Sequence, residues 1–156
     1  MNALDGFDVK ILAAIQENAA LTNQDIADRI GLSASQISRR RQRLEQGGII
    51  RRYRADLDLQ ALGLAVTAYV GVTLGSHSRE NARKFRNMVK AMPEVQEAHT
   101  MTGDVDYILK VVVPDLQALS RVINDDLLPQ DAVQNVRSSI AMDTIKDDNL
   151  LPLEAR

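Results

Sequence analysis

The sequence predicts an α+β protein with an N-terminal (winged) helix-turn-helix domain followed by a ferredoxin-like βαββαβ domain. Apolar residues recur at helical spacing in the first third of the chain, whereas beyond residue 65 they alternate with the period of a strand. Arginine is concentrated between residues 33 and 54 of a 156-residue chain whose formal net charge is only −2. The expected parts are residues 1–54 for the helical domain, 55–64 for a linker, 65–146 for the second domain and 147–156 for a tail.

Three helices are predicted before residue 47. The spacing of apolar residues places the first over residues 5–17. Thr22 with Asp25, and Ser33 with Gln36, have the spacing of capping boxes, in which side chains satisfy the free N–H groups at a helix start. They open a second and a third helix, and Gly31 supplies the turn between these two. Two glycines end the third helix near residue 46.

The third helix has one apolar face and one entirely polar face. At about 100° per residue, Ala34, Ile37 and Leu44 share the inward face. Arginine can pair with the guanine edge and glutamine with the adenine edge, while serine can contact a base or a phosphate. We therefore predict a recognition helix that reads duplex DNA through the outward residues Ser35, Gln36, Ser38, Arg39, Gln42 and Arg43.

The other arginines of this segment suit the DNA backbone better than the bases. Arg40 and Arg41 lie on the flanks of the third helix, where phosphate contacts or salt bridges are expected. Arg51, Arg52 and Arg54 follow in a segment that suits a strand or a small wing and would reach the backbone. An isolated arginine run is usually a solvated face, but residues 33–54 hold seven arginines and one glutamate within this helical pattern. The context favours DNA binding, with Arg40, Arg51, Arg52 and Arg54 among the contacts.

The second half of the chain predicts alternating strands and helices. Residues 66–74 alternate as a strand with one buried face, Ser78 caps a helix, and Pro93 follows its end. Residues 95–102 and 106–113 form two strands joined by a tight turn at Gly103-Asp104. Asp115 caps a second helix, and a last strand begins at residue 133. The order is βαββαβ, one antiparallel sheet with two helices on one face.

Composition excludes several classes of protein. No apolar run approaches the roughly 20 residues of a membrane span, and the N-terminus lacks the pattern of a signal peptide, so we expect a cytoplasmic protein without a membrane partner. The absence of cysteine excludes disulfides and thiol catalysis. Two histidines at unrelated positions predict no metal site, and no nucleophile with a paired base is visible. An enzyme is therefore not expected, although a small metabolic enzyme stays an alternative, since ferredoxin-like domains host many chemistries.

Four stretches of the chain together resemble the Lrp/AsnC (feast/famine) family of transcriptional regulators. They are LDGFDVKILAAIQENAALTNQDIADRIGLS, SQISRRRQRLEQGGIIRRYRADLD, MTGDVDYILKV and IKDDNLLPL. The resemblance implies an N-terminal DNA-binding domain, a linker strand, and a C-terminal domain that dimerises and binds a small effector, often an amino acid. It also implies assembly into tetramers or octamers, and no cofactor. Arg41 departs from the pattern, because it fills a position that is usually apolar.

The resemblance places an effector site at the turn Thr102, Gly103, Asp104, Val105, Asp106, which matches the family's ligand-binding turn. A free amino acid needs donors for its carboxylate and an anion for its ammonium group, and the N–H groups around Gly103 with Asp104 or Asp106 supply both. Ser138 aligns with a polar position of the family's pocket. Two alternatives stay open: a plain hairpin turn, and an architectural DNA-binding protein that senses no effector.

Overall fold

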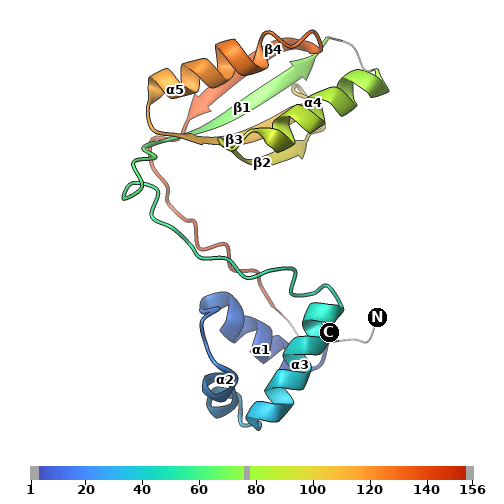
Figure 1. The fold of residues 1–156 in the computed structure, drawn as a ribbon, viewed down its shortest axis with the longest axis vertical. Coiled ribbons are helices and arrows are strands. Elements are labelled where there is room, and N and C mark those ends of the chain that lie inside the picture. Colours follow the sequence, from blue (N-terminus) through green and yellow to red (C-terminus); the bar gives the residue numbers. More distant parts are fainter. Residues whose placement is uncertain (1–3, 76–77, 154–156) are drawn as a thin grey trace. The chain divides into compact units, whose positions relative to one another are not determined.

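The computed structural model describes residues 4–75 and 78–153. Its internal contacts divide the chain into two compact units (Figure 1). The first contains the chain up to Asp56 together with the C-terminal segment from Lys146, and the second contains Leu57–Ile145. The C-terminal segment therefore belongs with the N-terminal unit.

Three helices make up the N-terminal unit: α1 (Gly6–Glu17), α2 (Asn23–Ile30) and α3 (Ala34–Gln46). Both expected capping boxes are confirmed, as is the left-handed Gly31 between α2 and α3, whose φ is 78°. A third capping box, between Asp5 and Asp8, opens α1. The caps fix where each helix begins, and the core of Ile11, Ile26, Ile37 and Leu44, each at most 1% exposed, packs the three together.

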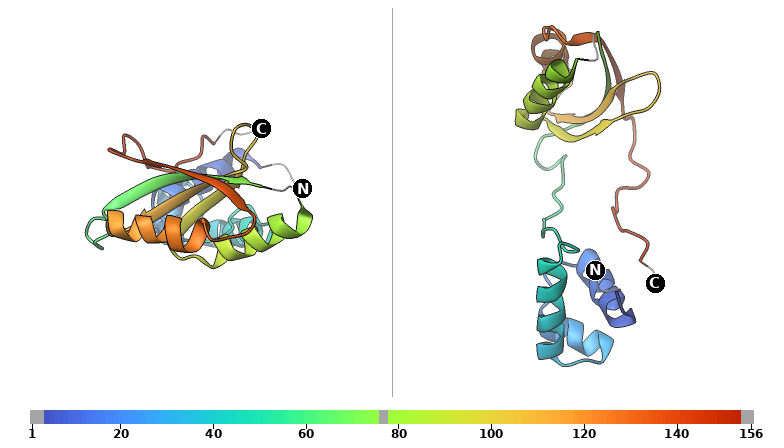
Figure 2. Two further views of the ribbon diagram at one scale, coloured as in Figure 1. Left: turned by 90° about the horizontal axis from the view of Figure 1, so that it is seen from above. Right: turned by 90° about the vertical axis from the view of Figure 1, so that its right-hand side faces the viewer.

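The second unit has the predicted βαββαβ order. Its elements are β1 (Val66–Leu74), α4 (Arg79–Ala91), β2 (Val95–Thr100), β3 (Tyr107–Val113), α5 (Leu116–Arg121) with its π-helical continuation η1 (Val122–Leu127), and β4 (Val133–Ile140). The strands form one antiparallel sheet in the order β2-β3-β1-β4. Both α4 and α5 lie on the same face of this sheet (Figure 2).

The central strand β1 shows how the sequence pattern builds this unit. Alternate residues Ala68, Val70 and Val72 are fully buried beneath the helices. Tyr69 points to the opposite face and is 45% exposed. The two helices cover only one side of the sheet, so its other side is open in the single chain (Figure 2).

The linker strand expected at 55–64 is wrong for the single chain. Residues 51–65 are all described and contain no strand, including the stretch at 51–54 that suited a strand or wing. Instead, the carboxylate of Asp58 accepts hydrogen bonds from the N–H groups of Gln60 (2.9 Å) and Ala61 (3.0 Å), and a turn ends at Gly63, whose φ is 74°. A strand requires a neighbouring backbone to pair with, and among the described residues no strand pairs with this segment.

One side chain joins the C-terminal segment to α1. The Nε2 of Gln16 donates to the carbonyl of Leu151 (3.0 Å), and the N–H of Leu151 donates to Oε1 of Gln16 (3.1 Å). A side-chain amide can both donate to and accept from one residue of the backbone, as paired residues of two neighbouring strands do. This pair is a direct contact between the C-terminal segment and the N-terminal unit.

We expect Gln16→Ala to release Leu151 while leaving the helices intact. Amide exchange of Leu151 should accelerate about fivefold, the equivalent of one hydrogen bond of about 1 kcal/mol. Gln24→Ala is the matched control, since Gln24 bonds only within α2, to Asp28. Unchanged exchange at Leu151 in the Gln16 variant would contradict this account of the segment.

Candidate functional site

The outward face of α3 is confirmed as polar and exposed. Ile37 and Leu44 define the buried direction of the helix. Six side chains project within about 70° of the opposite direction, and all six are exposed. They are Ser35, Ser38, Arg39, Gln42, Arg43 and Gln46.

Gln36 lies on the edge of this face and takes part in the helix cap. Its Oε1 accepts the N–H of Ser33 (2.9 Å) and the hydroxyl of Ser33 (3.0 Å). The hydroxyl of Ser35 lies 3.0 Å from that of Ser33. The cap therefore occupies the acceptor of Gln36, and only its amide NH₂ stays available to a partner.

Arg40 and Arg43 are held by a buried carboxylate of α1. Asp8 is 0% exposed, and its Oδ1 lies 2.8 Å from Nη1 of Arg40 while its Oδ2 forms an ion pair with Nη2 of Arg43. Arg40 also pairs with Asp5 at 2.7 Å. Arg40 lies about 50° from the buried direction of α3, and its side chain extends from α3 to α1. The Arg43 side chain stays 50% exposed.

The charges of this cluster stabilise one another. Hydrogen bonding from Arg40, with a further bond from the N–H of Asp8, lowers the pKa of Asp5. The same pairing to Asp5 and Asp8 raises the pKa of Arg40. The Arg40 guanidinium also lies 5.5 Å from the centre of the Phe7 ring, within cation–π range. Arg40 is thus committed to contacts inside its own unit.

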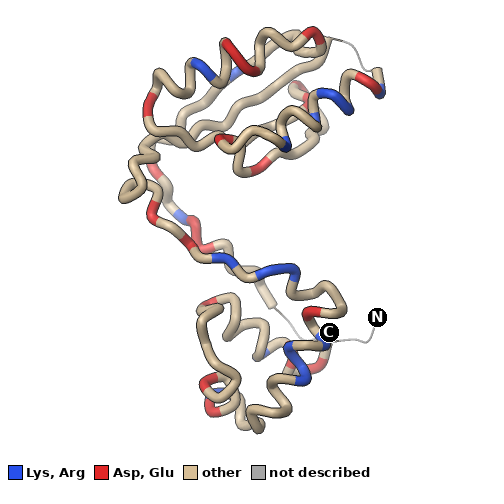
Figure 3. Tube along the Cα trace, in the orientation of Figure 1, with Lys and Arg blue, Asp and Glu red and all other residues tan. Residues whose placement is uncertain are grey.

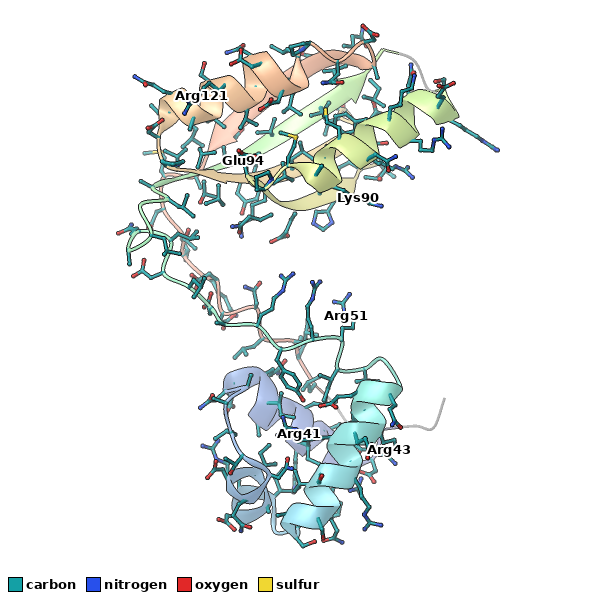
Figure 4. The ribbon with its side chains drawn as sticks, in the orientation of Figure 1. Arg41, Arg43, Arg51, Lys90, Glu94 and Arg121 are labelled. Atoms are coloured by element: carbon teal, nitrogen blue, oxygen red, sulfur yellow. The ribbon has the colours of Figure 1, made fainter. Side chains whose placement is uncertain are left out.

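Arg41 is held on the other side of α3. It donates to the carbonyl of Leu21 (3.3 Å), to Oδ1 of Asn23 (3.0 Å) and to the hydroxyl of Tyr53 (3.2 Å). The Tyr53 hydroxyl in turn donates to Glu45 at 2.7 Å, and burial followed by this bond raises the pKa of Tyr53. Figure 4 shows Arg41 and Arg43 leaving α3 on opposite sides.

Tyr53 therefore ties the segment after α3 back to that helix. Arg51, Arg52 and Arg54 flank it and are exposed. Within residues 4–75 and 78–153, none of these three, nor Arg39, has a carboxylate within ion-pair distance. Figure 3 shows the resulting run of Lys and Arg along α3 and the segment that follows it.

The loop between β2 and β3 contains the expected effector turn. Thr102, Gly103 and Asp104 are exposed, and Gly103 has the positive φ, 128°, that favours glycine. Asp106 is structural: its carboxylate accepts the N–H of Leu74 at 2.7 Å, and its own N–H donates to a β1 carbonyl at 3.0 Å. The two carboxylates of the turn thus differ, because only that of Asp104 has no partner among the described residues.

Among the described residues, no hydrogen bond joins Ser138 to this loop. Ser138 lies on β4 opposite Val70, while the loop bonds to β1 at Val72 and Leu74. The Val105 side chain of the turn lies against Gly71, the residue that follows Val70. Ser138 and the turn are therefore near one another along β1 without a described bond between them.

Within the described ranges, no helix combines the length and apolar character needed to cross a membrane. Over the same residues, no three His, Cys, Asp or Glu side chains gather as a metal site would require. The structure thus directs attention to α3 and to the β2–β3 loop.

A trihelical unit with an exposed polar recognition helix, joined to a βαββαβ unit, defines a DNA-binding protein with a second, ligand-binding domain. Residues 4–51 match the family of winged helix-turn-helix DNA-binding domains, and residues 67–151 match the Lrp/AsnC ligand binding domain. The chain belongs to the Lrp/AsnC family of transcriptional regulators. The resemblance read from the sequence is confirmed.

Relatives align over nearly the whole chain. The transcriptional regulator AzlB of Bacillus subtilis is 35% identical, covering 97% of this chain and 96% of its own. The leucine-responsive regulatory protein of Escherichia coli is 32% identical, covering 98% and 93%. A Neisseria meningitidis regulator solved as a complex with L-methionine has a TM-score of 0.93 at 35% identity, covering 96% of this chain and 97% of its own. An AsnC family regulator from Agrobacterium tumefaciens has a TM-score of 0.90 at 39% identity, with the same coverage.

We expect Asp8→Asn to destabilise the N-terminal unit by about 2 to 3 kcal/mol, because one substitution weakens two charge-assisted bonds and turns an amide NH₂ toward guanidinium groups. Arg40 and Arg43 both keep access to water, which holds the loss below that of a fully buried pair. Urea unfolding measures the loss.

Asp28→Asn serves as the control for Asp8→Asn, since it removes an exposed carboxylate of the same unit and should change the free energy of unfolding by less than about 0.5 kcal/mol. Equal stability of the two variants would refute the anchoring role of Asp8.

Proposed function

We propose that this regulator reads its operator through Ser35, Ser38, Arg39 and Gln42. The observation that carries the proposal is that these side chains are exposed on one face of α3 while Arg40 and Arg41 are held inside the unit. Arg39 has a free bidentate guanidinium for the guanine edge, and Gln42 lies one turn away with a free amide for the adenine edge. Gln36 contributes a donor only, because the cap occupies its acceptor.

Phosphate contacts complete the proposed interface. Arg51, Arg52 and Arg54 are exposed and unpaired, and Tyr53 keeps their segment beside α3. Arg43 can add a contact through its exposed half without leaving Asp8. Arg40 is assigned a positioning role in place of the DNA contact expected from the sequence. We propose that a protein with this task acts in the cytoplasm, together with the DNA that it regulates.

We further propose an amino acid as effector, bound at the β2–β3 loop. The support is chemical, since Asp104 offers an unpaired carboxylate for an ammonium group and the backbone around Gly103 offers donors for a carboxylate. A relative with a TM-score of 0.93 was solved with L-methionine. Asp106 holds the loop in place, and we propose that Ser138 joins the site from a second copy.

The open side of the sheet supports a proposal of self-association. Tyr69 is 45% exposed there, and Ile108 of the neighbouring strand is half-buried on the same side. We propose that a second copy covers this surface to form a dimer, with tetramers or octamers built from it. An effector that prefers one assembly would change the number or spacing of recognition helices offered to DNA.

Arg39→Ala should lose discrimination between operator and random duplex. One bidentate base contact is worth about 1 to 3 kcal/mol, so the affinity ratio should fall about 5- to 150-fold. Fluorescence anisotropy with both duplexes at one salt concentration measures it. Arg29→Ala removes the same charge from an exposed site on α2 and should leave the ratio unchanged. The assignment fails if Arg39→Ala weakens both duplexes equally.

Asp104→Asn should keep the fold and DNA binding but weaken effector binding about 10- to 100-fold, the effect of losing a charge-assisted bond of about 1.5 to 3 kcal/mol. Calorimetric titration with L-leucine and L-methionine measures this loss. Asp106→Asn is the contrasting variant, since it should lower the melting temperature by weakening the bond to Leu74.

Overlapping titrations of Asp104→Asn and wild type would remove Asp104 from the site. No heat with any of the twenty amino acids would favour an architectural DNA-binding protein without an effector.

A further inference from the structure

A second basic surface lies on α4, far along the chain from the helix-turn-helix. Arg79, Arg83, Arg86 and Lys90 follow one another at intervals of four, three and four residues. At 100° per residue they fall within about 60° of one another and form a straight stripe along the helix. All four are exposed, and they line one shallow groove along α4. Figure 3 shows Lys and Arg gathered on this helix.

No described carboxylate neutralises the stripe. Among the described residues, no carboxylate lies within ion-pair distance of these four side chains. Arg86 donates only to the hydroxyl of Tyr107, at 3.4 Å. The acid of this helix, Glu80, pairs with Lys84 on the other flank. The recognition helix α3 differs from α4 in this respect, because two of its arginines, Arg40 and Arg43, form ion pairs with Asp8.

The positive charge is confined to α4, because the rest of its unit is acidic. α4 holds five Lys/Arg and one Glu, whereas the rest of residues 57–145 holds three Lys/Arg and ten Asp/Glu. Phe85 and Val89 attach α4 to the sheet through a side about 110° around the helix from the stripe, so the fold does not require arginine at the exposed positions. A row of unpaired cations on an acidic domain fits a polyanion.

We propose that the stripe Arg79, Arg83, Arg86, Lys90 binds the phosphate backbone of duplex DNA, as a second, sequence-independent surface separate from α3. From Arg79 to Lys90 the helix rises about 16 Å. Duplex DNA carries one phosphate per strand for each 3.4 Å of its axis, so the stripe matches about five consecutive base pairs. DNA is favoured over an acidic protein because this chain is already a DNA-binding regulator. A second copy docking through its acidic α5–η1 face is the competing occupant.

The test compares two full-length double variants with equal loss of charge. Arg83→Gln/Lys90→Gln removes half of the stripe, and Lys84→Gln/Arg121→Gln removes two exposed cations outside it. Affinity for a random 60-base-pair duplex and for operator DNA is measured between 50 and 200 mM salt. The stripe variant should flatten the slope of log K against log salt by about 1.8, so affinity changes about tenfold less across this range. The control should keep the wild-type slope.

An unchanged slope in the stripe variant, or an equal change in the control, overturns the proposal. Light scattering of both variants without DNA distinguishes DNA from a second copy as the partner of the stripe. A smaller assembly in the stripe variant alone would assign α4 to contacts between copies and would also overturn the proposal. Arg83 and Lys90 have no part in the proposed operator reading. A lost preference for operator DNA with an unchanged salt slope would therefore count against the proposed operator reading by α3. A changed salt slope with an intact preference would support only the proposed DNA contact of α4.

Discussion

The carboxylate of Asp8 is the constraint on which the DNA-binding unit depends. A buried charge is costly unless it is paired and hydrogen bonded, and Asp8 meets that requirement by holding Arg40 and Arg43 of α3, together with the Asp5 N–H of its own capping box. The pairing sets the rotation of α3 against α1. Once that rotation is set, Ile37 and Leu44 face the core and the polar face has one direction in which to project. The charged anchor and the apolar core specify the same packing.

This anchor divides the arginines of α3 into two groups. Arg40 and Arg41 lie about 50° to either side of the buried direction, close enough to reach acceptors on α1, on α2 and beyond the helix. Arg39 lies nearly opposite that direction and has no such acceptor. Counting arginines therefore overstates the charge that α3 presents to DNA. Much of the long-range attraction must come from the exposed segment that follows the helix.

The parts that could be predicted are those fixed by local chemistry. Thr22–Asp25, Ser33–Gln36 and Gly31 act within one helical turn, so their spacing in the sequence was sufficient to place the helix ends. The alternation in β1 was likewise visible, because each residue's face follows from its parity.

The missed features depend on partners distant in the chain. Asp8 lies three residues before Ile11, on the apolar face of α1, and this position indicated that it would be buried. Its arginine partners, however, are more than 30 positions away in the sequence. Gln16 and Leu151 are 135 positions apart, so no local pattern could connect them. The linker strand that the resemblance implied is also missing from the single chain, because a strand exists only where another backbone pairs with it.

The most direct test of the central claim is a crystal structure of the full-length protein bound to its operator. The account predicts that Arg39 and Gln42 contact base edges while Arg40 stays paired with Asp8. A structure in which Arg40 has left Asp8 for the DNA, with Arg39 directed into solvent, would contradict it.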